Sequence, residues 1–143
     1  MPTSTFNLGK DCTVVVIAPT GQQIDLSIVT GFEAKQQVHK LRVKPLNGPP
    51  QGADLPDGWE GTFSIERGSS AADNLFSTLE SGYWAGGVMG TGQIFQYITE
   101  VNGSQSVYQF NNVTMSLSDS GHWQPDSAVK QTISFFASTR KAL

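Results

Sequence analysis

A segment that alternates like a strand and then repeats like a helix, residues 58 to 87, constrains the fold of this chain more than any other stretch. Its first part places Trp59, Phe63 and Ile65 on one face and polar residues on the other, as in a half-buried strand. Its second part carries apolar residues at helical spacing, namely Ala72, Leu75, Phe76 and Leu79. We therefore expect a strand followed at once by a helix over about 70–81, whose apolar stripe packs on a β core.

The two ends of the expected helix carry local signals. Ser70 followed by Asp73 matches the Ser/Thr-x-x-acid capping pattern, although Asp is a weaker third member than Glu. Gly82 is the expected C-cap, because glycine adopts the left-handed conformation that commonly ends helices. Nothing in the segment has the pattern of a nucleophile or a phosphate loop, so we expect the helix to serve the structure.

The remaining apolar segments have strand patterns. They cover residues 12–19, 23–29, 91–101, 104–120 and 126–139. The first two should form a hairpin, and Asn102-Gly103, the strongest hairpin dipeptide, joins the next two. The alternation changes parity near Asn111-Asn112, which indicates a bulge or bend. A chain of 143 residues is most simply one domain, residues 1–143, here mainly β with one helix.

A polar segment and a Pro/Gly-rich segment stand apart from the rest. Residues 30–46 have weak strand patterning. This segment holds four of the nine cations, Lys35, Lys40, Arg42 and Lys44. Residues 47–58 contain three prolines and three glycines, so we expect a projecting loop over 46–58 and no regular element. Neither segment has an evident packing role inside one compact subunit, so both are expected to project from it. Open strand edges can pair with a strand of another chain, and the pattern therefore favours an assembly protein.

The sequence offers little for catalysis or metal binding. His39 and His122 lie far apart, and neither has local partners with metal-ligand spacing. Asp54, Asp57 and Glu60 could form a carboxylate cluster, but acids in a Pro/Gly loop are usually solvated. No nucleophile motif is present, and the glycine-rich run after the helix fits neither a Walker loop nor a dinucleotide fingerprint. We therefore expect no enzyme activity, no metal and no cofactor.

Charge and hydropathy narrow the class of partner. A formal net charge of -3 argues against a protein that grips nucleic acid by charge. The basic segment 35–44 could enter a DNA groove as a β-ribbon, but it lacks interleaved aromatic residues that would stack on exposed bases. We favour a polar strand exposed to water or to a partner subunit. Cys12 lies beside an apolar run and is expected to be a buried thiol, and no apolar run has membrane-spanning length.

The stretch "LPDGWEGTFSIERGSSAADNLFSTLESGYWAGG" resembles the tail tube proteins of contractile-tailed bacteriophages. In that family a strand of the form W-x-G-x-F-x-I-x-R leads directly into a helix with an Asp-x-Leu-Phe core. The matching positions are Trp59, Gly61, Phe63, Ile65, Arg67, Asp73, Leu75 and Phe76. The order of elements agrees over most of the chain, whereas the motif covers this stretch alone.

The resemblance implies a tail-tube-like fold of two packed antiparallel sheets, sandwich- or barrel-like, with one flanking helix. It implies a structural virion protein whose homo-hexameric rings stack into the inner tail tube, inside a contractile sheath. The channel would hold the tape-measure protein and later pass genomic DNA. Assembly would take place in the bacterial host cytoplasm, without membrane contact. Such channels are expected to be acidic, so the basic segment 35–44 departs from the family.

Other interpretations stay open beside the tail tube. Related folds occur in the tube protein of type VI secretion, and an adaptor at the end of a tube is a further alternative. A monomeric β-sandwich binding module, or a small hydrolase, would instead run on a sizing column as a lone domain of 15.4 kDa.

The residues expected to matter fall into two groups. Candidate contacts between subunits or rings are Lys40, Arg42, Leu46, Asn47, Pro49, Pro50, Asp54, Leu55 and Asp57. The packing motif is expected to comprise Trp59, Phe63, Ile65, Arg67, Leu75, Phe76 and Leu79. The helix would then hold the projecting loop at a defined angle toward a neighbouring subunit or ring.

Overall fold

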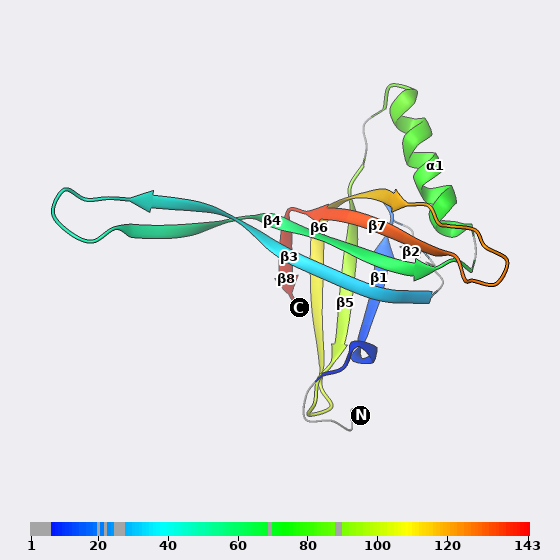
Figure 1. Ribbon diagram of the computed structural model, residues 1–143, viewed down its shortest axis with the longest axis horizontal. Helices are drawn as coiled ribbons and strands as arrows, with labels where there is room; N and C mark the ends of the chain where they lie inside the picture. Colours follow the sequence, from blue (N-terminus) through cyan, green and yellow to red (C-terminus); the bar gives the residue numbers. More distant parts are fainter. Residues whose placement is uncertain (1–6, 20, 22, 25–27, 69, 88–89) are drawn as a thin grey trace.

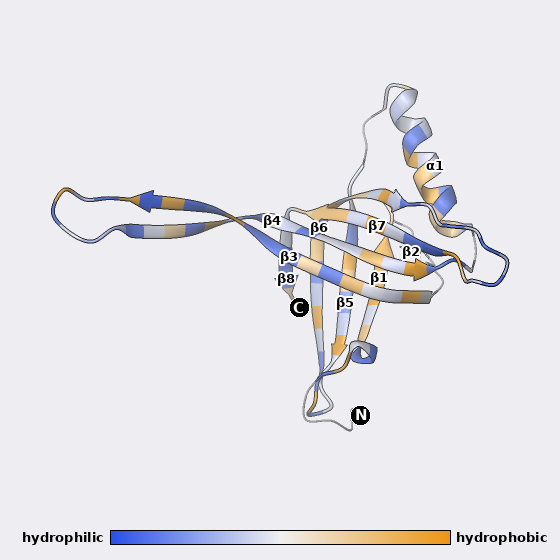
Figure 2. Ribbon diagram, viewed as in Figure 1, coloured by the Kyte–Doolittle hydropathy of each residue, from blue (hydrophilic) through white to orange (hydrophobic). Residues whose placement is uncertain are grey.

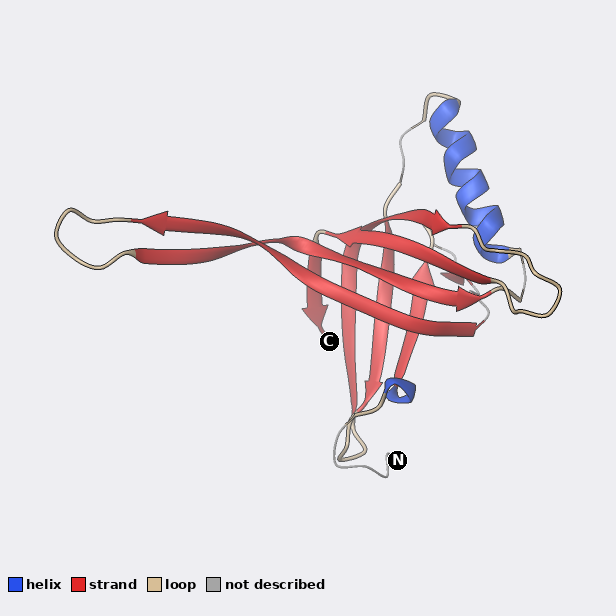
Figure 3. Ribbon diagram, viewed as in Figure 1, coloured by secondary structure: helices blue, strands red, loops and turns tan. Residues whose placement is uncertain are grey.

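The fold is known from a computed structural model, which describes residues 7–19, 21, 23–24, 28–68, 70–87 and 90–143. It is mainly β and antiparallel with one α-helix among the described residues, which confirms the expected fold class. The strands are β1 (Cys12–Ile17), β2 (Gln23–Ile24), β3 (Ile28–Val43), β4 (Gln51–Glu66), β5 (Gly92–Thr99), β6 (Gln105–Asp119), β7 (Lys130–Ala137) and β8 (Thr139–Ala142). A short 3-10 helix, Gly9–Asp11, precedes β1, and α1 spans Ala71–Trp84 (Figure 1, Figure 3).

All the described strands belong to one hydrogen-bonded sheet, which is folded into two layers. The order is β2-β1-β5-β6-β7-β4-β3, and β8 pairs with β6. Strand β6 joins the layers, because its first part, up to Val113, pairs with β5 and its second part, from Thr114, pairs with β7. Figure 1 shows β1 and β5 running across the direction of β3, β4 and β7. The two packed sheets are therefore two halves of one open sheet.

The bend in β6 lies where the alternation of the sequence changes parity. Asn112 has φ 52, the one positive φ among the described non-glycine residues. The pairing with β5 shifts register next to it, between Gly92 and Ile94. Asparagine tolerates this left-handed conformation better than most residues. The predicted bend near Asn111-Asn112 is thus confirmed, and it carries β6 from one layer into the other.

The hydrophobic core lies between the two layers. The largest fully buried side chains are Val16, Phe63, Ile65, Ile94, Phe110, Val113, Gln131 and Ile133. Phe110 is central, since its ring centroid lies 6.0 Å from that of Phe32 and 5.8 Å from that of Phe135. Trp59 adds an edge-on contact with Phe110 at 6.0 Å. Aromatic contacts of this kind join β3 and β4 of one layer to β6 at the junction.

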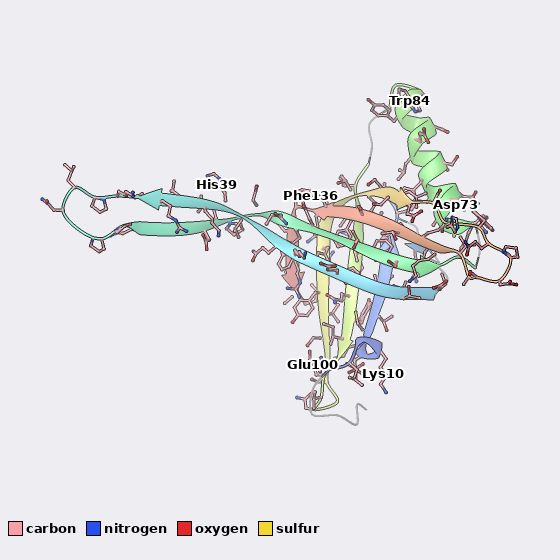
Figure 4. The ribbon with its side chains drawn as sticks, in the orientation of Figure 1. Lys10, His39, Asp73, Trp84, Glu100 and Phe136 are labelled. Carbon is pink, nitrogen blue, oxygen red and sulfur yellow. The ribbon has the colours of Figure 1, made fainter. Side chains whose placement is uncertain are left out.

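The sequence predicts that the apolar stripe of helix α1 packs along the core, but in the structure most of the stripe does not. Ala72 is its one buried residue, and Phe76 is half-buried against the core. Tyr83 and Trp84 are 53% and 74% exposed, and Figure 4 shows Trp84 at the far end of the helix. The two β layers already close the core on each other, so the helix contributes to it only through its first turns.

The start of α1 is held by a cluster that replaces the predicted capping box. The Ser70 side chain makes no cap hydrogen bond. The Asp73 carboxylate instead accepts hydrogen bonds from Arg67 Nε and from Gln131 Nε2, both at 2.9 Å. Gln131 is 1% exposed, so this cluster fixes the first turn of the helix to β7. The Asp73 oxygens are therefore engaged by side chains from other elements.

The end of α1 lies beyond the predicted glycine. The helix passes through Gly82 and ends at Trp84. Gly86 has φ 90 and donates its N–H to the carbonyl of Tyr83 at 3.0 Å, while Gly87 donates to the carbonyl of Gly82 at 2.9 Å. These two bonds form a Schellman ending, in which Gly86 supplies the left-handed residue.

Candidate assembly surfaces

The outer halves of β3 and β4 form a two-stranded ribbon that projects from the body of the subunit (Figure 1). Val38–Val43 pairs with Gln51–Pro56 in continuous register, and we call these two segments the distal ribbon. Strand β7 pairs with β4 only from Trp59 onward. Among the described strands, none covers the distal ribbon on either edge.

The predicted bounds of the Pro/Gly loop, 46–58, are wrong. Only residues 44–50 connect the two strands, and the rest of the 46–58 segment belongs to β4 or to a bulge in it. Pro56 lies within the strand, opposite Val38. Proline is tolerated on an edge strand or beside a bulge, where its missing N–H interrupts no ladder of hydrogen bonds. The free edge of β4 thus explains how a strand can contain this composition.

A β-bulge lies at the base of the distal ribbon. The register between β3 and β4 shifts between Gln36 and Val38, which leaves Asp57 and Gly58 without a paired partner in β3. Gly58 has φ 92, a conformation that glycine adopts readily and other residues do not. A Cβ on Gly58 would also lie 2.6 Å from the ring of Phe136. The bulge therefore needs glycine, and it sets the direction in which the ribbon leaves the body.

The distal ribbon has one apolar face and one charged face, since side chains alternate along each strand. The apolar ribbon face carries Leu41, Val43, Ala53 and Leu55, with His39 and Gln51 beside them. The charged face carries Lys40, Arg42 and Asp54, with Val38 and Pro56 next to the bulge. Leu41, Val43 and Leu55 are 47%, 53% and 47% exposed, and Figure 2 shows apolar segments on both strands of the ribbon. A contiguous exposed apolar face of this kind marks an interaction surface.

The cations of the distal ribbon have no ion-pair partner among the described residues of the subunit. The ion pairs that the structure contains lie elsewhere, at Lys35–Glu33 and at the start of α1. Lys40 stands opposite Asp54 in the register, but the two make no ion pair. Lys40 and Arg42 are thus free to meet acids on another subunit.

Strand β3 leaves a long hydrogen-bonding edge uncovered. It has 16 residues, it is last in the sheet, and among the described strands it pairs only with β4. An open edge presents unpaired N–H and C=O groups to a strand of another chain. An edge of this length suits a subunit that completes its sheet by assembly.

A second apolar surface lies between α1 and β6, and we call it the α1–β6 groove. Its volume is about 680 Å³. Its apolar lining consists of Phe76, Leu79, Tyr83, Trp84, Met115 and Leu117. Glu80 lies on its helical side, where it accepts a hydrogen bond from Trp84 Nε1 at 3.3 Å. The groove is open because the second half of α1 diverges from the body (Figure 4).

The predicted contact residues are gathered by the fold into one projection. The distal ribbon and its connection hold Lys40, Arg42, Leu46, Asn47, Pro49, Pro50, Asp54 and Leu55, and Asp57 lies in the bulge. All of them are exposed, Leu46 fully. Sequence reasoning missed Leu41 and Val43, which share a face with Leu55. Their spacing of two is the available signal, although the polar residues between them weaken the strand pattern.

The predicted packing residues occupy several different environments. Phe63 and Ile65 are buried in the core, and Trp59 packs against it. Arg67 holds the start of the helix through Asp73. Leu75, Phe76 and Leu79 are all partly exposed.

Other candidate sites of the sequence stay separate in the fold. His39 is exposed on the distal ribbon and His122 is exposed before β7. Within the described part of the chain, no three His, Cys, Asp or Glu side chains gather as a metal site. Cys12 is half-buried, not buried as expected, and accepts a hydrogen bond from Gln96 Nε2 at 3.4 Å. In the same described part, no helix is long and apolar enough to cross a membrane.

Comparison with solved structures finds other chains that have a similar fold. The chain is similar to a chain in the structure of the sheath/tube terminator of an extracellular contractile injection system, PVC, with TM-score 0.65, 10% identity and 99% coverage of each chain. It is similar to a chain in the structure of the tube-terminating cap of the anti-feeding prophage, with TM-score 0.63 and 12% identity over 100% of this chain and 91% of that one. A chain of the extended PVC sheath-tube complex matches with TM-score 0.59 and 10% identity over 99% and 91%. The fold is one used in contractile injection systems. No model of a protein family matches the sequence, and no curated protein matches it.

Proposed function

We propose that this chain is a structural subunit of the inner tube of a contractile tail or injection system. The observation that carries the proposal is the distal ribbon, whose apolar face and free edges have no use within the subunit. Copies of the chain form rings, which we expect to be hexameric, and the rings stack inside a sheath. The likeness in fold to tube and terminator chains supports this setting.

The apolar ribbon face and the open edge of β3 would each contribute only a weak contact, so the assembly would be held together by many such interfaces. Covering the exposed half of an aliphatic side chain contributes about 1 kcal/mol, so the three large residues of the apolar ribbon face would contribute about 3 kcal/mol per interface. The open edge of β3 adds backbone hydrogen bonds with a neighbour. Each subunit of a ring repeats these contacts, and a closed or stacked arrangement gains from their multiplicity.

The subunit has a mechanical task in this proposal and no catalytic one. In a phage tail, the channel would hold the tape-measure protein and then pass DNA, and the sheath would surround the tube. Assembly would occur in the cytoplasm of the bacterial host, and the finished protein would reside in the tail.

Self-association tests the proposal directly. We expect the purified chain, without metal or ligand, to form rings or tubes as its concentration rises. Analytical ultracentrifugation measures the oligomeric state, and negative-stain electron microscopy shows the shape. A chain that stays monomeric at high concentration and is absent from purified tail particles would contradict the proposal.

A component at the end of the tube is the second candidate, favoured by the likeness to a cap and a terminator. A subunit of the tube body offers matching surfaces on both faces of its ring, so it grows into filaments. A terminal component should stop at single rings or short stacks. The length distribution in micrographs separates the two.

A further inference from the structure

The α1–β6 groove leaves a large apolar surface uncovered within the subunit. Phe76 and Leu79 line it from the helix, and Met115 and Leu117 line it from β6. Trp84, at the far end of α1, is 74% exposed. A volume of about 680 Å³ is enough to hold several side chains of a partner. An apolar surface of this extent indicates a docking site.

The groove is open because α1 is fixed at one end only. Asp73 binds Arg67 and Gln131 at 2.9 Å each, and Ala72 is buried beside them. Beyond this first turn the apolar side of the helix faces the groove, with no buried residue in the rest of α1. An occupant of the groove would therefore give the second half of the helix the apolar contacts that it lacks.

The distal ribbon of a second copy has the chemistry to fill the groove. The apolar ribbon face would meet the apolar lining. Between residues 38 and 56 the chain carries three cations, Lys40, Arg42 and Lys44, against one acid, Asp54. Helix α1 carries two acids and no cation, and Glu80 has no ion-pair partner among the described residues. The two surfaces are thus complementary in hydropathy, and the ribbon segment and the helix carry net charges of opposite sign.

The dimensions and positions of the two surfaces also agree. Val38–Val43 spans about 20 Å at about 3.3 Å per residue, and the 14 residues of α1 span about 21 Å at about 1.5 Å per residue. Figure 1 shows the ribbon and α1 leaving opposite ends of the molecule. A projection at one end and a groove at the other produce a head-to-tail contact, which either closes into a ring or continues along a stack.

We propose that the apolar ribbon face of one copy lies in the α1–β6 groove of the next copy. This contact rests on the proposed self-assembly and names the surface that receives the ribbon. Trp84 then closes the open end of the groove over the incoming strand pair, and the charged face of the ribbon, with Lys40 and Arg42, points away from the groove.

Cross-linking between two variants tests the contact. In a Cys12→Ser background, one protein carries Gln51→Cys beside the apolar ribbon face, and a second carries Ser77→Cys in the groove. The two are mixed, assembled and treated with a short bismaleimide, and the products are separated by denaturing electrophoresis. We expect a heterotypic cross-link that needs both proteins. The matched control replaces Ser77→Cys by Thr78→Cys, on an exposed position outside the groove lining, and should lose the cross-link.

The outcomes separate this inference from the proposed function. A heterotypic product that disappears with Thr78→Cys, and also when Leu79→Ser is added to the groove protein, supports the contact. Rings or tubes in micrographs without this product overturn the contact and leave the proposed function standing, with the groove available to another protein such as the sheath. Failure of the parent Cys12→Ser protein and of the unaltered chain to assemble at all overturns both.

Discussion

The β3–β4 hairpin has an inner half that packs against the rest of its subunit and an outer half that does not. In the inner half Phe63 is 1% exposed, and the ring of Phe32 stacks on that of Phe135 at 5.7 Å. In the outer half Leu41 and Leu55 follow the same alternation, yet both are 47% exposed. The backbone pairing continues through both halves, with one register shift at the bulge and another between Val29 and Gly31. The two halves therefore differ in what covers them, and the outer half has the composition of a sheet whose covering layer belongs to another molecule.

The largest effect is expected from the inner half. Phe63→Ala should lower the free energy of unfolding by about 3–5 kcal/mol, because it removes a fully buried aromatic ring and leaves a cavity. Denaturant unfolding, followed by tryptophan fluorescence at a concentration where the chain is monomeric, measures it. Leu55→Ala on the same strand is the matched control and should change the free energy of unfolding by less than about 0.5 kcal/mol. Equal losses at the two positions would show that the outer half also belongs to the folding core.

The reverse pattern is expected for assembly. Leu41→Ser combined with Leu55→Ser should weaken self-association by about 2 kcal/mol per interface, since the two side chains would otherwise bury their exposed halves there. The melting temperature of the monomer should stay close to that of the unaltered chain. Sedimentation velocity gives the association constant. Normal rings and tubes from the double variant would mean that the apolar ribbon face is not an interface.

A substitution at the junction of the two halves should have an intermediate effect. Gly58→Ala forces a side chain into a positive φ and toward the ring of Phe136, at a cost of about 1–3 kcal/mol in unfolding free energy. Because the bulge directs the ribbon, assembly should fall further than stability alone predicts. Gly52→Ala is a comparison within the distal ribbon, where the added methyl would crowd the guanidinium end of the long Arg42 side chain and make an ordinary contact with the Leu41 carbonyl. An unchanged association constant for Gly58→Ala would mean that the angle of the ribbon is not used.

The comparison also shows what the sequence could and could not predict. Alternation located β1, β5, β6 and β7 but did not predict β8, and the change of parity at Asn111-Asn112 located the bend that makes two layers out of one sheet. The prediction made from composition was wrong in the Pro/Gly segment. Pro56 and Gly58 suggested a loop, but an edge strand with a bulge accepts both residues, and a free edge is a property of the whole sheet.

The prediction that the apolar face of the helix packs on the core was wrong for a related reason. The spacing of Leu75, Phe76 and Leu79 correctly indicates an apolar face, but spacing does not say which surface covers that face. In this chain the two β layers fill the core between themselves, and the apolar side of α1 is left to line a groove. Similarly, Asp73 matched a capping pattern but binds Arg67 and Gln131, and the latter lies far along the sequence. Periodic patterns thus identify surfaces, whereas the tertiary fold decides which of them stay exposed for partners.

The smallest effect is expected from the charged face of the distal ribbon. Arg42→Glu should weaken self-association by about 0.5–1 kcal/mol per interface, or about two- to fivefold in Kd, because exposed ion pairs contribute little in water. Added salt should weaken the unaltered assembly in the same direction. Lys141→Glu, on an exposed position of β8, is the matched charge reversal and should leave the Kd unchanged.

If Arg42 and its neighbouring cations are occupied by acids of another subunit, assembled tubes should not retain duplex DNA near physiological ionic strength, since binding to several phosphates would appear as a steep dependence on salt. Tight, salt-sensitive DNA binding that Arg42→Glu abolishes while rings persist would instead place the charged face toward the channel, and the ribbon would then serve the cargo and not the neighbouring subunit.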